Sequence, residues 1–163
     1  MSEPPTLAIT TPADTELRFT RLFKAPRALV FETLTRPEFL ARWMIGPDGW
    51  TMTVCEVDLQ PGGRFRYVWT RDGGREMGMG GTFLEVDPPA RIVHLEVFDE
   101  DWTGGETRVT TEFVERDGVT ELTLTVRYAS MAARDGALQS GMTVGMEMSY
   151  GRLDDLLALE RPA

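Results

Sequence analysis

The stretch GALQSGMTVGMEMSYGRLDDLLAL, residues 136–159, decides the fold. It contains no proline, and its apolar residues recur at steps of three and four, the spacing that places them on one face of an α-helix. Such a helix draws most of its stability from packing that face against another element. The residues of this face are Leu138, Met142, Met146, Ser149, Leu153, Leu156 and Leu157.

The surface that would cover this helix is predicted upstream, in short segments that alternate apolar and polar residues. Most of these segments are joined by tight turns, the pattern of an antiparallel meander. Pro26 and Pro37 each open a short helix after the first strand, because proline is accepted in a first helical turn. The predicted strands cover 16–23, 51–59, 64–70, 76–86, 91–98, 107–115 and 119–128.

The simplest arrangement that buries both patterns is an α+β fold. A curved antiparallel sheet of about six or seven strands wraps around the long C-terminal helix, with the two short helices after the first strand. The chain of 163 residues is the size of one domain, which we predict over 16–160. Residues 1–15 hold three prolines among small polar residues and are predicted to be a flexible N-terminal segment.

The charge balance excludes several classes of partner. Lys and Arg number 17 and Asp and Glu 26, which gives a formal net charge of −9. This excess of acid repels phosphate backbones and anionic headgroups, so we expect no nucleic-acid partner. No apolar run approaches the roughly 18 residues of a membrane span, so no membrane insertion is expected. The first residues lack a secretion signal, and we expect a cytoplasmic protein.

The single cysteine and the single histidine limit metal and redox chemistry. Cys55 alone excludes an internal disulfide and a cysteine-based zinc site, and His94 alone excludes a multi-histidine site. We therefore expect no metal and no cofactor.

His94 lies on a predicted strand that has two possible inner faces. Val93, Leu95 and Val97 form a wholly apolar face, which favours His94 on the solvent side. If the other face lines an interior space, His94 and Glu96 become a polar pair two residues apart, suited to acid–base work or to anchoring a ligand. The alternation leaves both options open.

Methionines, aromatic residues and glycines gather on the predicted sheet and helix. Methionine adapts to irregular partners, and glycine leaves room that a larger side chain would fill, so an internal apolar cavity competes with an ordinary filled core. The residues concerned include Trp43, Tyr67, Trp69, Met77, Met79, Met142, Met146, Gly78, Gly80, Gly81 and Gly145.

Four segments together resemble one known family: ARWMIGPDGW at 41–50, EVDLQPGGRFRYVW at 56–69, GGTFLEVDPPARIVH at 80–94 and SGMTVGMEMSYGRLDDLL at 140–157. They are similar to bacterial proteins that resemble the C-terminal domain of the activator of the Hsp90 ATPase, within the START-like (polyketide cyclase and lipid transport) superfamily. The resemblance covers about residues 17–158. It implies a helix-grip fold with a cavity between sheet and helix. The family often has Trp where this chain has Met44 and Met146.

These observations favour non-catalytic binding of a small hydrophobic or aromatic molecule in that cavity. One alternative is a cyclase or dehydratase acting on a polyketide-like substrate, with His94 and Glu96 as acid and base. Another is a cochaperone-like domain that binds a protein, and a protein partner or a homodimer is possible. The residues expected to line the cavity are Trp43, Arg66, Tyr67, Trp69, Met79, Glu96, Phe98, Met142, Met146 and Tyr150.

Overall fold

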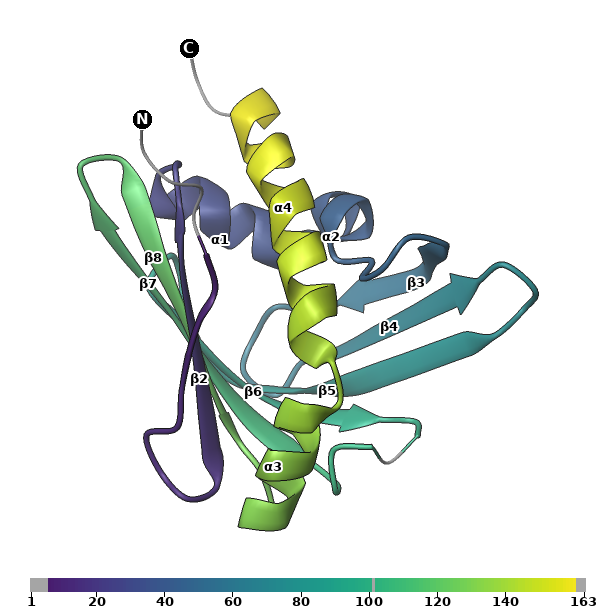
Figure 1. Ribbon diagram of the computed structural model, residues 1–163. Helices are drawn as coiled ribbons and strands as arrows, with labels where there is room; N and C mark the ends of the chain where they lie inside the picture. Colours follow the sequence, from purple (N-terminus) through teal and green to yellow (C-terminus); the bar gives the residue numbers. More distant parts are fainter. Residues whose placement is uncertain (1–5, 101, 161–163) are drawn as a thin grey trace.

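The computed structural model describes residues 6–100 and 102–160, which form one strongly curved antiparallel sheet with helices on its concave side (Figure 1). The helices are α1 (Arg27–Thr35), α2 (Pro37–Trp43), α3 (Met131–Gln139) and α4 (Met142–Glu160). The strands are β1 (Ala8–Thr10), β2 (Glu16–Phe23), β3 (Trp50–Val57), β4 (Arg64–Arg71), β5 (Glu76–Asp87), β6 (Arg91–Phe98), β7 (Thr107–Arg116) and β8 (Val119–Arg127). The predicted helix-grip fold is confirmed.

The sheet has the strand order β1-β2-β8-β7-β6-β5-β4-β3, and every pair is antiparallel. Strands β3 to β8 form the predicted meander, and β2 closes against the last strand of the chain. The sheet has eight strands rather than six or seven because β1 adds a short edge strand to β2. Residues 1–5 lie outside the described residues, and Ala8–Thr10, within the segment predicted to be flexible, forms this edge strand.

The alternation of side chains divides the sheet into a concave and a convex face. On the concave face, residues that pair across neighbouring strands form rows that cross the middle of the sheet. One row joins Cys55, Tyr67, Met79 and Phe98. The next row joins Val57, Phe65, Gly81, Glu96 and Thr107.

Helix α4 lies along the concave side and also touches α1 and α2 (Figure 1). Its second half is the best buried: Leu153, Leu156 and Leu157 are at most 4% exposed. Arg21 on β2 reaches Asp154 on α4 through two hydrogen bonds of 2.8 and 2.6 Å, which ties the helix to the sheet. The helix is therefore held by an apolar stripe and one charge-assisted clamp.

The C-terminal helical region is broken, whereas the pattern over 136–159 predicted one continuous helix. Gly141 has a φ of 86°, a left-handed conformation that ends α3 before α4 begins. Ser130 is the N-cap of α3, and its side chain accepts a hydrogen bond from the Ala133 backbone N–H. Because of the break, Leu138 is 38% exposed and does not extend the buried stripe of α4.

Within the described part of the chain, no helix combines the length and the hydropathy needed to cross a membrane.

Leu153→Asp should unfold the domain. Leu153 is fully buried, and an unpaired carboxylate there would cost about 3–5 kcal/mol, enough to lower Tm by roughly 10 °C or more. The matched control is Leu159→Asp on the same helix, where the side chain is 75% exposed. Thermal melts followed by circular dichroism measure both variants, and equal Tm values would contradict the assignment of the buried face.

Candidate functional site

Most of the predicted cavity residues lie on the concave face. Tyr67 and Met79 face each other across β4 and β5, and Met79 pairs in turn with Phe98 on β6. Met146 packs against the main apolar cluster, and the hydroxyl of Tyr128 lies 3.9 Å from the sulfur of Met142. Trp69, Phe98, Met142 and Met146 are only half-buried, unlike the leucines in the second half of α4.

Two predicted residues serve mainly to support the wall of this surface. Trp43 is 3% exposed, donates its indole N–H to the Thr33 carbonyl at 2.7 Å and stacks on Tyr150 with ring centroids 5.9 Å apart. Tyr150 is 6% exposed and also meets Phe23 edge-on at 5.4 Å. Both belong to the packed core that joins α2, α4 and β2.

Arg66 does not share this surface, and its predicted place in the cavity is wrong. Neighbouring residues of a strand point to opposite faces, so Arg66 cannot lie on the face of Phe65 and Tyr67. It points to the convex side and forms a bidentate ion pair with Asp99, with N–O distances of 2.7 and 2.6 Å. The side-chain hydrogen bond between them holds the pKa of Asp99 below its usual range.

His94 and Glu96 face the concave surface, so the expectation of a solvent-facing His94 is wrong. Their side chains are 15% and 21% exposed, and His94 Nε2 lies 3.0 Å from Glu96 Oε1. The imidazole meets the Phe65 ring edge-on at a centroid distance of 5.3 Å. The apolar face of β6 points the other way, so Leu95 and Val97 lie on the convex side.

The other nitrogen of this imidazole has no partner. His94 Nδ1 is buried and forms no hydrogen bond to any residue that the structure describes. A carboxylate only accepts hydrogen bonds, so Nε2 of His94 donates to Glu96, and Nδ1 is the nitrogen left without a partner. The pair therefore presents one under-satisfied imidazole and one carboxylate on an otherwise apolar surface.

Three tyrosines lie within electrostatic reach of Glu96. Burial, and then the negative charge of Glu96, raise the pKa of Tyr128 to about 12. The pKa of Tyr67 and of Tyr150 is also raised, first by burial, with Glu96 adding to the effect. These hydroxyls stay neutral at physiological pH and can donate or accept hydrogen bonds.

Three residues of this surface are missing from the predicted set. Phe65 shares the concave face with Tyr67 and Trp69, so strand alternation could have identified it. Trp102 comes from the loop after β6 and packs against Phe98 with centroids 4.8 Å apart. Tyr128 directly follows β8, and the register of β6, β7 and β8 places it in line with Thr107 and Glu96.

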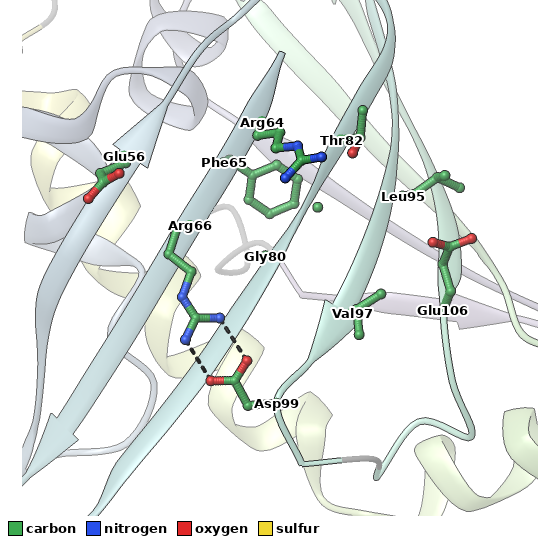
Figure 2. A pocket seen from close by; sticks show the side chains of 11 residues that line it. Glu56, Arg64, Phe65, Arg66, Gly80, Thr82, Leu95, Val97, Asp99 and Glu106 are labelled. Carbon is green, nitrogen blue, oxygen red and sulfur yellow. Dashed lines mark hydrogen bonds and ion pairs between the residues drawn. The ribbon is translucent and has the colours of Figure 1, made fainter. Parts of the chain in front are cut away.

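A hollow of about 520 Å³ lies on the convex face, outside the predicted cavity (Figure 2). Its floor is formed at Gly80, between the arginines of β4 and the side chains of β6, and the Arg66–Asp99 pair crosses it. A Cβ at Gly78 would collide with the carboxylate of Asp99, so this glycine admits the ion pair. The hollow is lined by Glu56, Arg64, Phe65, Arg66, Gly80, Gly81, Thr82, Leu95, Val97, Asp99 and Glu106.

The convex hollow contains no acid–base pair like the one on the concave face. Two of its charged side chains, Arg66 and Asp99, neutralise each other, and both are more than 40% exposed. Across the described ranges 6–100 and 102–160, no group of three or more His, Cys, Asp or Glu side chains is placed to hold a metal ion. The concave surface is therefore the stronger candidate for a specific site.

Gly81→Ala should destabilise the protein far more than Gly78→Ala. A Cβ at Gly81 would collide with the backbone carbonyl of Leu95 and lie 2.8 Å from the Phe65 ring, which predicts a loss of about 1–3 kcal/mol. At Gly78 the colliding groups are the ends of two exposed side chains that can swing away, at a cost below about 1 kcal/mol. Urea unfolding measures both, and similar losses would contradict the close packing at Gly81.

Cys55 should react slowly in the folded protein. Burial, and secondarily the charge of Glu38, raise the pKa of its thiol to about 11. Because folding disfavours the thiolate, the stability contribution is absent below the unfolded pKa and becomes a loss as pH rises from about 9 to 11. We expect alkylation by iodoacetamide at pH 9 to be at least about tenfold slower than in urea. Equal rates would show an accessible thiolate.

Comparison with solved structures identifies close relatives of the fold. A crystal structure of a Rhodobacter sphaeroides protein is 38% identical, with a TM-score of 0.89, over 94% of this chain and 99% of that chain. A Mycobacterium smegmatis protein is 28% identical, with a TM-score of 0.81, over 94% and 97% of the two chains. An AHSA1-like protein from Aeromonas hydrophila is 23% identical, with a TM-score of 0.71 over 90% and 97%, and shares the fold.

Among curated proteins, none matches the chain. The sequence profile of the activator of Hsp90 ATPase homolog 1-like proteins matches residues 24–158, which span α1 to the last turns of α4. This match confirms the resemblance read from the four sequence segments. The chain belongs to the family of activator of Hsp90 ATPase homolog 1-like proteins.

Proposed function

We propose that the protein binds a small hydrophobic or aromatic molecule on the concave face, between β4–β6 and the first half of α4, without converting it chemically. One observation carries this proposal: half-buried apolar side chains and a polar pair share a single inner surface. Trp69, Phe98, Met142 and Met146 supply the apolar part, and His94 and Glu96 supply the polar part.

Incomplete burial of these side chains supports a ligand surface over an ordinary core. Leu153 and Leu157, about two and three turns after Met146 on α4, are at most 2% exposed, which is normal for a filled interior. Towards the start of the helix the apolar side chains keep contact with solvent. Apolar walls with a few convergent polar groups are the usual composition of a small-molecule site.

Family membership supports the same class of function at a coarser level. Membership of the activator of Hsp90 ATPase homolog 1-like family supports a START-like ligand-binding domain or a domain similar to the Hsp90 activator. The methionines at 142 and 146 favour adaptable binding, because a thioether adjusts its shape to different partners. We propose several related ligands held weakly rather than one held tightly.

Acid–base catalysis on a bound polyketide-like molecule is the second candidate, favoured by the position of His94 and Glu96 on the concave surface. In this function Glu96 would take a proton from the bound molecule while His94 orients the carboxylate. His94→Gln and Glu96→Gln separate the two functions. If the protein only binds the molecule, neither the parent nor the two variants convert it. If the protein is an enzyme, the parent converts the molecule, and the variants lose turnover while they still bind it.

Met146→Trp should weaken the binding of large ligands more than that of small ones. The indole would fill space beside the half-buried first part of α4, and overpacking would cost about 1–3 kcal/mol if that space is already full. A neutral solvatochromic dye such as Nile red, displaced by neutral aromatic compounds of increasing size, measures the effect.

The matched control is Val144→Trp on the same helix, where the side chain is 60% exposed. It should leave the affinities unchanged. Equal affinities across all ligand sizes in the parent and in Met146→Trp would place Met146 outside the site. Absence of binding by any hydrophobic compound would remove the proposed function.

A further inference from the structure

We propose that the concave site selects molecules that carry a protonated amine on an aromatic or apolar body, with the Glu96 carboxylate as the anchor for the ammonium group. This inference rests on the proposed function and names the class of ligand. It follows from the charges and rings that surround Glu96.

Glu96 is a half-buried carboxylate with too few partners. Its side chain is 21% exposed, and its one hydrogen bond in the described part of the chain joins Oε1 to His94 Nε2. A carboxylate can accept about four hydrogen bonds, so Glu96 keeps acceptor positions open to a donor from a ligand. The buried Nδ1 of His94 also has no hydrogen-bond partner among the described residues.

The arginines nearest to this surface are already engaged elsewhere. Arg21 faces the concave side, but both of its terminal nitrogens bind Asp154. Arg66 is on the next strand but one, yet it points to the convex side and binds Asp99 (Figure 2). Within the described residues, no ion pair joins Glu96 to an arginine or a lysine, and its hydrogen-bond partner there is His94.

Aromatic rings border this carboxylate. Gly81 stands opposite Glu96 on β5, so no side chain separates Glu96 from the Phe65 ring in the same row. The Phe65 ring packs against the Tyr67 ring with centroids 5.1 Å apart, and the Tyr67 ring packs against Trp69 with centroids 5.9 Å apart. On the same face of β6, Phe98 follows Glu96.

This combination discriminates by charge. Ring faces attract a cation, and a carboxylate in a partly desolvated site adds a charge-assisted hydrogen bond. The same carboxylate repels a ligand that carries a carboxylate or phosphate group, and both Arg21 and Arg66 are already paired with other carboxylates. An amphipathic amine is therefore favoured over a neutral or an anionic molecule of the same shape.

The test uses three probes that share one ring system: naphthylmethylamine, naphthylmethanol and naphthylacetate. Calorimetric titration of the full chain at pH 7 measures each affinity. We expect the amine to bind at least about tenfold more tightly than the alcohol, which is the scale of one charge-assisted hydrogen bond. We expect the acetate to bind most weakly. Because this comparison needs only the unmodified protein, it remains decisive if a variant fails to fold.

Glu96→Gln locates the anchor. The amide keeps the shape and removes the charge, so the preference for the amine should disappear while the affinity for the alcohol changes by less than about twofold. The matched control is Glu106→Gln, an exposed carboxylate beside the convex hollow, which should keep the full preference. Circular dichroism confirms that each variant is folded.

Equal affinities of amine and alcohol in the unmodified protein would overturn the inference and leave the proposed function intact. Loss of the amine preference in Glu106→Gln rather than in Glu96→Gln would also overturn it, because the anchor would then lie on the convex face. If none of the three probes binds, both the inference and the proposed function fail.

Discussion

Burial of the second half of α4 against the concave face of the sheet is the constraint on which the rest of the structure depends. Leu153, Leu156 and Leu157 are buried in the core that the concave face shares with α1 and α2. The Arg21–Asp154 pair adds direction to this contact, because a bidentate pair holds one helix position opposite one strand position. Curvature of the sheet and placement of the helix are therefore one packing solution.

Dense packing of the second half of α4 holds the helix in place, so the residues of its first half are free to vary in sequence. The helix starts after the Gly141 break, and Met142 and Met146 in its first half are only half-buried. Met142 packs against the apolar cluster of β2, β7 and β8, and Met146 touches both apolar clusters. Stability is thus concentrated where α1, α2 and α4 meet, and the candidate site lies where few side chains are needed to hold the fold. This separation explains how one fold can keep its architecture while the residues of its inner surface change.

The chemistry of that inner surface depends on the register of the strands. Glu96 stands next to Gly81 and Phe65 in one row, and Phe98 stands next to Met79 and Tyr67 in the following row. A shift of one residue would send Glu96 to the convex side and bring Leu95 or Val97 inward. The close approach of Gly81 to the Leu95 carbonyl protects the register at this point, since no larger residue fits there.

The sequence by itself determined the fold class, the meander, the two short helices and the family, because period-two and period-3.6 patterns and turn residues are local signals. It also located most residues of the candidate site. Only the tertiary structure decided that β6 turns His94 and Glu96 inward, since alternation defines two faces of a strand but not which one is covered. The outward direction of Arg66, the pairing of β1 with β2 and the arrival of Tyr128 near Glu96 depend equally on contacts between distant segments. Such contacts follow from sheet curvature and helix docking, which no short stretch of sequence encodes.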